Sequence, residues 1–330
     1  SAAPCLRQNG RPGPCGTGLL CPRHPWHPHE TEAGAPIAAI RLKNDQLVQA
    51  LDLARRSGPV RDIVIPPCPE LLVQLQNATA TGEPDLEAIA RIASADVAMA
   101  AALMRQANSP LFGLQQPVGT VGQALNVLGM RPAVKLLSGF LTRHALQVHS
   151  PLLAHFWETS TRRAIACEHI GQQLYGMDAG LSYTFGLFCH VGMPVMMAGV
   201  KGYGGTLTEA MARQDRSFTQ TENANHRTDH AVVGAIVART WRLPQPVAIA
   251  IRLHHDFTCL GDSGFGDTER RLVAMGLIAD HLVHQHEGLA PLREWQSFGP
   301  ACLGFLEVGE GEVNAWIDEL HPAFEAVVLA

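Results

Sequence analysis

The densest group of side chains that could bind a metal lies at the start of the chain. Its candidate ligands are Cys5, Cys15, Cys21 and His24. Thiolate and imidazole groups together suit a tetrahedral zinc ion, and a segment without a periodic apolar pattern has little means of building a core of its own. The spacing C-x9-C-x5-C-x2-H contains a single close pair. Residues 1–36 are therefore predicted to form either a zinc-stapled knot or a flexible tail.

The other five cysteines are spread along apolar stretches of a long chain, where free core thiols are the usual interpretation. They are Cys68, Cys167, Cys189, Cys259 and Cys302. No glycine loop with the lysine of a phosphate-binding motif is found either, since the run at Gly202, Gly204 and Gly205 has no lysine at the required place.

Composition narrows the class of protein. The 330 residues are 46% hydrophobic and 17% charged, with a formal net charge of -5, which is ordinary for a globular protein. Basic residues are scattered among acidic ones, so direct nucleic-acid binding is not expected. Long uncharged apolar runs and a secretory layout are not recognised in the sequence, so we expect a cytoplasmic protein that does not enter a membrane.

Helical periodicity dominates from residue 37 onward, and the predicted fold class is all-α, a helical bundle. A lead-in helix is expected within residues 37–59, followed by an extended connector over 60–69 because of its three prolines. Beyond a helix predicted over residues 70–77, Asp85 is predicted to cap a short helix and Ser94 a longer one that follows it. Further helices are predicted over residues 120–128, 132–146, 152–174, 179–197, 206–213, 229–241, 246–254, 268–286 and 311–328. Residues 199–205 and 217–228 are expected to be loops.

Several spaced elements in residues 92–137 resemble the first half of an HDOD domain, an output domain related to HD phosphohydrolases. The matching residues are Asp96, Leu103, Asn108, Ser109, Phe112, Gly113, Ala124, Leu128 and Gly129. Local physics also accounts for some of them, because Asn108 and Ser109 before a proline stop a helix and Gly129 ends one. A ligand or partner role for Asn108 and Ser109 stays open beside that structural one.

The resemblance extends over about residues 60–286, and it sets the expected domain boundaries. An HDOD domain is predicted over residues 60–290, with an N-terminal helical subdomain at about 60–145 and an HD-like subdomain at 150–290. Residues 291–330 are expected to be a C-terminal helical tail.

The resemblance also implies a metal site that this chain has partly lost. HD phosphohydrolases hold one or two divalent metals with imidazoles and an adjacent His-Asp pair, which lowers the pKa of bound water. Here the pair reads His190-Val191, and residues 158–160, where a first histidine is expected, are Glu, Thr and Ser. The implied vestigial site consists of His190, His230, His254, His255 and Asp280.

Two interpretations of this vestigial site remain open. In the first, His190, His230 and one of the pair His254 and His255 still converge with Asp280 as an acidic ligand, since neighbours on a helix point about 100° apart. In the second, the histidines are buried and hydrogen-bonded to backbone carbonyls.

The resemblance, together with the missing carboxylate at Val191, favours a non-catalytic regulatory protein that binds a signalling partner or a small signal such as a nucleotide. A metal-dependent phosphohydrolase of nucleotides or cyclic dinucleotides is the alternative. A metal or redox sensor built on the N-terminal cysteines is the second alternative.

Overall fold

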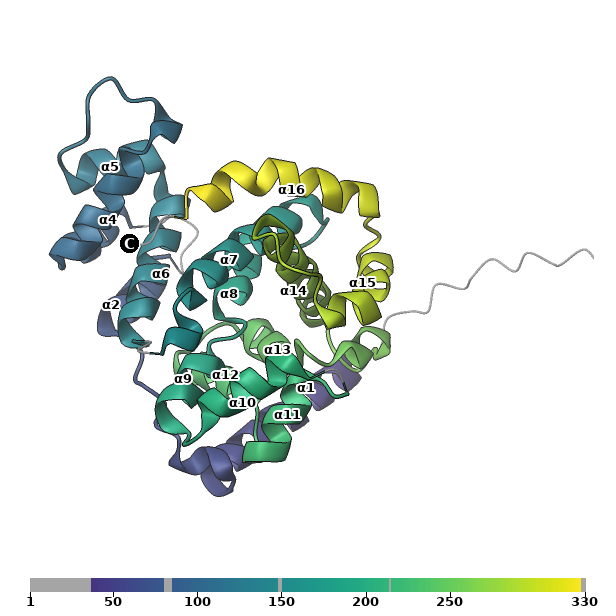
Figure 1. Cartoon of the computed structure of the whole chain (residues 1–330). Helices are drawn as coiled ribbons and strands as arrows, with labels where there is room; N and C mark the ends of the chain where they lie inside the picture. Colours follow the sequence, from purple (N-terminus) through teal and green to yellow (C-terminus); the bar gives the residue numbers. More distant parts are fainter. Residues whose placement is uncertain (1–36, 80–84, 148–149, 214, 328–330) are drawn as a thin grey trace, which may run out of the picture. The chain divides into compact units, whose positions relative to one another are not determined.

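The computed structural model describes residues 37–79, 85–147, 150–213 and 215–327, with side chains from residue 43 onward. Within these ranges every regular element is an α-helix or a short 3-10 helix (Figure 1). The prediction of an all-α helical fold is confirmed.

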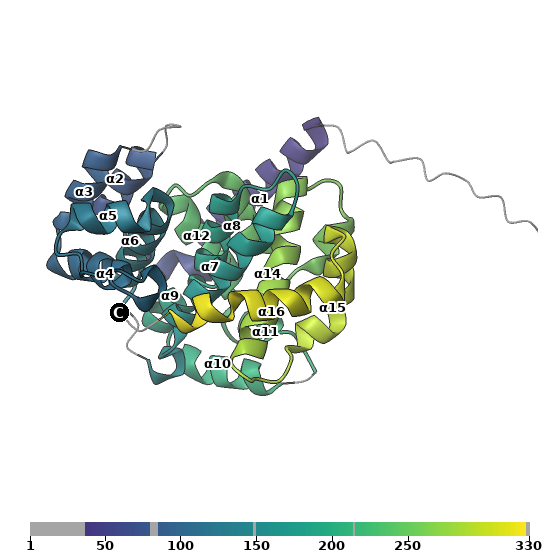
Figure 2. The same cartoon turned by 90° about the horizontal axis from the view of Figure 1, so that it is seen from above.

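The first part of the chain forms a lead-in helix and a small group of helices that pack on one another (Figures 1 and 2). Its elements are α1 (Ile37–Ser57), η1 (Pro59–Asp62), α2 (Glu70–Thr79), α3 (Leu86–Ser94), α4 (Val97–Ala107), η2 (Pro110–Phe112), α5 (Val121–Leu128) and α6 (Met130–Ala145). Helix α1 packs on the second part of the chain, where the Asp52 carboxylate accepts hydrogen bonds from Arg239.

Helix starts in this part follow acidic and hydroxyl caps. Asp85 accepts from the amide of Ala88 and begins α3, as predicted. The predicted cap at Ser94 is wrong, because Ser94 is the last residue of α3 and Asp96 caps α4. The carboxylate of Asp96, two residues further on, is the stronger cap because it accepts hydrogen bonds from two backbone amides, those of Ala98 and Met99.

The second part of the chain contains the longer helices. Its elements are η3 (Pro151–Leu153), α7 (Phe156–Gln173), α8 (Ala179–Phe188), α9 (Gly192–Gly199), α10 (Tyr203–Ala212), α11 (Phe218–His226), α12 (His230–Thr240), α13 (Gln245–Leu253), η4 (Phe257–Gly261), α14 (Asp267–His286), α15 (Arg293–Leu306) and α16 (Glu310–Glu325). Helix α14 contacts α7, α8, α13, α15 and α16 and so lies at the centre of this group.

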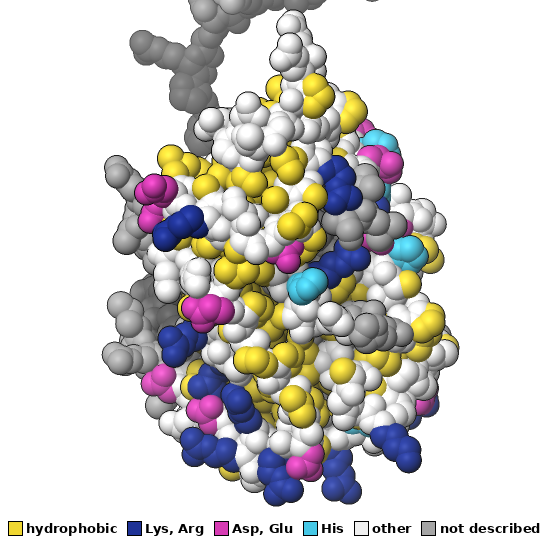
Figure 3. Space-filling view, turned by 90° about the vertical axis from the view of Figure 1, so that its left-hand side faces the viewer, with side chains coloured by type: hydrophobic (Ala, Val, Ile, Leu, Met, Phe, Trp, Pro, Cys, Tyr) yellow, Lys and Arg dark blue, Asp and Glu magenta, His cyan; other side chains and the backbone are white. Residues whose placement is uncertain are grey.

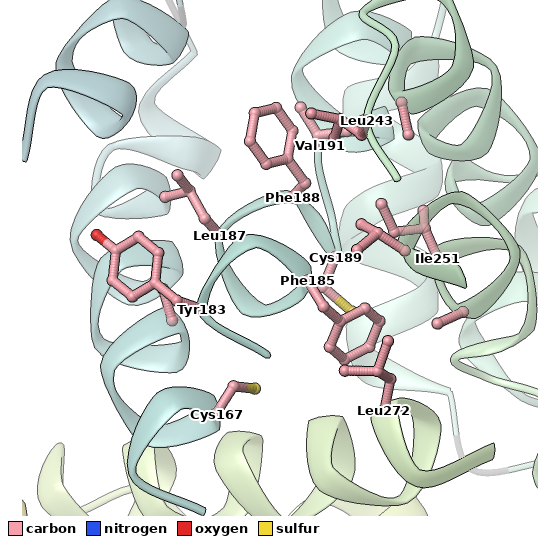
Figure 4. Packing of buried hydrophobic residues seen from close by; sticks show 14 of the residues in the cluster. Cys167, Tyr183, Phe185, Leu187, Phe188, Cys189, Val191, Leu243, Ile251 and Leu272 are labelled. Carbon is pink, nitrogen blue, oxygen red and sulfur yellow. The ribbon is translucent and has the colours of Figure 1, made fainter. Parts of the chain in front are cut away.

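Helix α8 carries much of the core of this part (Figure 4). Phe185, Leu187 and Phe188 are almost fully buried. Helix α8 lies directly on α7 because Gly186 leaves room: a Cβ there would lie 2.7 Å from the Cα of Ala164. The stretch 179–199 is long and apolar enough to span a membrane: its most apolar 18-residue window has a mean hydropathy of 1.3, and 72% of that window is buried inside the fold. Its apolar character therefore matches its place in the core.

Three sequence predictions for this part are wrong. The helix predicted over 179–197 is two helices, α8 and α9, separated at residues 189–191. The loop predicted over 217–228 contains α11, whose polar residues show no apolar period but whose start is fixed by a capping box of Ser217 and Gln220. Helix α10 begins at Tyr203, inside the loop predicted over 199–205.

The two parts are joined by a few specific contacts. Lys135 on α6 forms an ion pair with Glu168 on α7, and the indole of Trp241 donates to the carbonyl of Pro66 at 2.9 Å. The largest group of buried hydrophobic side chains runs through both parts. A subdomain boundary near residues 145–150 stays a prediction.

Candidate functional site

Four imidazoles from distant positions in the chain meet inside the second part. His190 lies in the break between α8 and α9, His230 is the first residue of α12, and His254 and His255 directly follow α13. His230 Nε2 lies 3.1 Å from His190 Nδ1, 3.2 Å from His254 Nε2 and 3.1 Å from His255 Nε2. His254 Nε2 lies 3.4 Å from His190 Nδ1. All four converging nitrogens lie within 4.8 Å of one another.

Both members of the pair His254 and His255 face this centre. The expectation that only one of them could do so is wrong. It assumed a continuing helix, but α13 ends at Leu253 and the two histidines lie in the turn that follows. Their ring centroids are 4.0 Å apart with an angle of 45° between the ring planes.

Each of the four rings meets an acceptor at its outer nitrogen. For His230 it is a carboxylate oxygen of Glu222, at 2.7 Å. For His254 it is the carbonyl of Ile251, at 2.6 Å. For His255 it is the carboxylate of Glu294 on α15, at 2.8 and 2.9 Å. For His190 it is Asp280 Oδ2, at 3.5 Å. These oxygens only accept, so the outer nitrogens carry the protons and the converging nitrogens of neutral rings are lone pairs.

Glu222 is a functional candidate that the sequence did not reveal. It lies on α11, is fully buried, and accepts a hydrogen bond from the Tyr203 hydroxyl at 2.5 Å. Burial opposes its ionisation, but the neighbouring His230 and the hydrogen bonds outweigh this and lower the pKa of Glu222. Burial and the Glu222 charge raise the pKa of Tyr203. A buried glutamate eight residues before a histidine in a polar run gives no pattern by which to find it.

Asp280 contacts the site from outside. Its Oδ1 accepts from Arg163 Nε at 2.5 Å, and its Oδ2 faces the outer nitrogen of His190. Burial opposes its ionisation, but the charge of Arg163 and the hydrogen bonds to Arg163 and His190 together outweigh it and hold the pKa of Asp280 well below its usual range. Asp280 therefore does not belong to the converging donors, and Arg163, which the sequence analysis did not single out, neutralises it. Arg163 Nη1 is buried and has no hydrogen-bond partner within the described ranges.

Burial sets the protonation of the rings. It lowers the pKa of His190 and of His254, and neighbouring positive groups lower it further. Burial also opposes the charged form of His255, but the carboxylate of Glu294, with those of Glu222 and Asp280, outweighs it and raises the pKa of His255.

The position of the missing aspartate is apolar. Val191 is fully buried, and Figure 4 shows it among the hydrophobic side chains, near Phe188 and Leu243. At the other altered position, Glu158 lies near His155 at 3.2 Å and Ser160 is buried without a hydrogen-bond partner among the described residues. Neither position supplies a carboxylate or an imidazole to the centre.

The family-motif residues lie in the first part of the chain and shape its backbone. Asp96 caps α4, and Gly129 ends α5 with a φ of 77°. The amide side chain of Asn108 accepts from the Val118 amide at 2.7 Å and donates to its carbonyl at 3.0 Å. Asn108 thereby closes the loop 109–117, and its φ of -87° is not left-handed. The Ser109 hydroxyl is buried with no hydrogen-bond partner in the described part of the chain.

The cysteines fall into two groups. Cys5, Cys15, Cys21 and His24 lie outside the described residues. Of the other five, Cys167, Cys189, Cys259 and Cys302 are buried free thiols and Cys68 is half-buried, in line with the predicted core thiols.

The centre contains what a single small ion needs from a protein. Four lone pairs converge, each ring is oriented by an acceptor behind it, and no carboxylate oxygen is among the converging atoms. Such a donor set fits a borderline transition ion better than magnesium or manganese, which favour oxygen.

Comparison with known proteins places this fold. A protein of Treponema pallidum described as uncharacterized is 27% identical over 267 residues, which cover 79% of this chain, and the chain spans half the length of that relative. An HDOD domain protein with unknown function from Geobacter sulfurreducens matches with a TM-score of 0.67 at 19% identity, covering 86% of this chain and 100% of that one. A protein described as a candidate phosphohydrolase from Shewanella amazonensis matches with a TM-score of 0.64 at 19% identity, covering 88% and 97%.

The family assignment rests on the sequence as well. The sequence profile of the HDOD domain matches residues 65–257, a range that contains Asp96, Asn108, His190 and His230. This chain belongs to the HDOD domain family.

Proposed function

We propose that this chain is a non-catalytic regulatory protein of HDOD type that acts by binding a signalling partner or a small signal. The observation that carries the proposal is that neither of the two carboxylates that a hydrolytic site would use is among the converging groups. Val191 occupies one position as a buried apolar residue, and Asp280 is held by Arg163.

Hydrolysis by a metal needs an open coordination position at which water can bind and ionise. From the described residues, the converging face receives four imidazoles and no carboxylate, and three of the four rings are buried. Four protein ligands complete a tetrahedral ion. An ion held there has no place for an attacking water, which supports a regulatory role.

The first part of the chain offers apolar surface to a partner. Leu86, Val97 and Leu111 are 57%, 87% and 70% exposed, although they are large and hydrophobic. Figure 3 shows hydrophobic side chains across the middle of one face of the molecule, with lysines and arginines toward its lower edge. An exposed apolar patch is typical of a protein interaction site. We therefore favour a protein partner over a nucleic acid. We also propose a cytoplasmic location, as expected from the sequence.

A metal-dependent phosphohydrolase remains the second candidate, because the histidines converge and a fold neighbour is described as a candidate phosphohydrolase. A sensor built on Cys15 and Cys21 is a third, and it predicts tight zinc that depends on these two thiols.

One assay separates the first two functions. The purified chain is incubated with bis-p-nitrophenyl phosphate, a nucleoside monophosphate and a cyclic dinucleotide, with manganese, magnesium or zinc added in turn. We expect no release of product above that of a His230→Ala variant. Metal-dependent turnover that the His230→Ala variant lacks would overturn the regulatory proposal and establish the phosphohydrolase.

A second measurement addresses partner binding directly. Cross-linking in cells compares the unmodified chain with a Val97→Glu/Leu111→Glu variant, and Tyr175→Glu serves as a control, since Tyr175 is 99% exposed and lies in the second part of the chain. We expect a cross-linked partner that only the double variant loses. Equal capture by all three chains would argue against Val97 and Leu111 as part of the binding surface.

A further inference from the structure

From the geometry we infer that His190, His230, His254 and His255 bind one zinc ion in a closed, all-imidazole tetrahedral site. The ion has a structural role in this inference, and it is distinct from the paired ions of a hydrolytic centre. The inference does not depend on the proposed partner binding.

The distances between the converging nitrogens fit one tetrahedral ion. A Zn–N bond of about 2.0–2.1 Å places two nitrogen ligands of a tetrahedron about 3.3–3.4 Å apart. The four nitrogen pairs with resolved contacts lie 3.1–3.4 Å apart. Two ions would need more room between the rings, because metal pairs lie about 3.5–4 Å apart.

With all four rings neutral, hydrogen bonds among them do not explain this arrangement. Each outer nitrogen faces an oxygen acceptor, so each neutral ring presents a lone pair to the other three. Lone pairs at about 3 Å repel one another unless a proton or a cation lies between them. A cation that accepts all four at once satisfies every ring without adding a proton.

The charges around the centre point to a divalent ion. Glu222 and Glu294 face the outer nitrogens of His230 and His255, and Asp280 faces that of His190. Arg163 neutralises one of these three carboxylates. Two negative charges remain behind the neutral rings, equal and opposite to the charge of Zn²⁺. Carboxylates in this outer position raise the basicity of the imidazoles and fix their orientation.

The chemistry of the donors selects the metal. Four nitrogens and no oxygen disfavour magnesium, calcium and manganese, and tetrahedral geometry is the usual preference of zinc. The ligands come from the break between α8 and α9, the start of α12 and the turn after α13. One ion would therefore fix three separate segments of backbone around α11, whose Phe218 packs against His230 and His255.

Zinc and cobalt(II) serve as the probes. The full chain with Cys15→Ser and Cys21→Ser is stripped with a chelator, so that the N-terminal thiols cannot contribute, and titrated with zinc against a chromogenic chelator. We expect one equivalent of zinc, and an intense visible spectrum with cobalt(II) typical of tetrahedral coordination and free of thiolate charge-transfer bands. A pale octahedral cobalt spectrum, or no zinc above background, would overturn the site.

Variants assign the ion to these residues. His230→Ala should weaken zinc binding by at least about 100-fold, and Glu222→Gln, which acts behind the ligand, by about 10- to 100-fold. His155→Gln is the matched control, because the His155 side chain is 77% exposed and pairs with Glu158 on the surface. If His230→Ala does not fold, His255→Gln replaces it, since His255 is only half-buried. Unchanged zinc affinity in His255→Gln and Glu222→Gln would refute the assignment. So would zinc binding that depends on His286, His321 and Glu325, a second cluster found among the described residues.

Discussion

Replacing Arg163 tests whether its charge supports the centre. The Arg163 and Asp280 side chains are 8% and 15% exposed and form a close ion pair. At a charge separation of roughly 4 Å and an effective dielectric of about 20, their attraction is about 4 kcal/mol. Arg163→Met removes the positive charge and leaves a buried carboxylate uncompensated, for which a cost of about 3–5 kcal/mol is expected.

Urea and thermal unfolding measure this cost. An unfolding entropy of about 2.1 cal/mol/K per residue over the described residues shifts the melting temperature by roughly 1.7 °C per kcal/mol, so the Arg163→Met variant should melt about 5–8 °C lower. The double variant Arg163→Met/Asp280→Asn removes the stranded charge and should recover at least half of the loss, because its amide still accepts from His190. Arg61→Met is the matched surface control, since Arg61 and Asp62 are 67% and 79% exposed, and its effect should stay within about 0.5 kcal/mol.

Two results would contradict this reasoning. If Arg163→Met lowers the free energy of unfolding by less than about 1 kcal/mol, the Asp280 carboxylate is not left as an uncompensated buried charge in the variant. If the double variant is no more stable than the single one, the loss comes from packing of the arginine stem.

Three further predictions concern other positions. Val191→Asp places a carboxylate in an apolar surrounding and should cost about 3 kcal/mol, seen as a lower melting temperature without any gain of manganese-dependent phosphodiesterase activity; a stable or active variant would refute it. His281 stacks on Trp295 at 3.8 Å, and burial, followed by the charge of His284, lowers the pKa of His281 to about 4. The unfolded chain therefore binds a proton more readily than the folded one, so the free energy of unfolding falls as the pH drops from about 6.5 to 4. Over that range the His281→Phe variant should lose about 2–3 kcal/mol less of its free energy of unfolding than the unmodified chain, measured by urea titration at each pH; equal losses in the two chains would contradict the prediction. Asn108→Ala removes two hydrogen bonds to Val118 and should cost about 1–2 kcal/mol and speed hydrogen exchange of the Val118 amide, whereas unchanged exchange would show that the loop closes without it.

The fold class could be predicted because helices leave local signals in a sequence. Apolar residues at helical spacing, the cap at Asp85 and the glycine at Gly129 are visible in a single sequence. The histidines were found through the family resemblance and not through spacing. His190 and His230 are 40 residues apart, and only the packing of α9 on α12 brings them together.

Two of the outer contacts of the centre, Glu222 and Glu294, could not be predicted, for a physical reason. Glu222 and Glu294 lie on α11 and α15. The first of these helices has a polar sequence held by its cap, and the second contains Pro300 and was expected only as part of a helical tail. A carboxylate that acts through another side chain has no spacing rule, since its position depends on how whole helices dock.

Gly192 shows how a residue without a functional group governs the spacing of the rings. A Cβ at this position would lie 2.0 Å from the carbonyl oxygen of His230 and 2.7 Å from the amide of Gly234. The two backbones touch here, two residues after His190 and at the very residue that carries the next imidazole. Even one added methyl group would force the two chain segments apart. Because metal–ligand distances vary by only about 0.2 Å, the proposed zinc ion would then bind weakly although all four imidazoles remain.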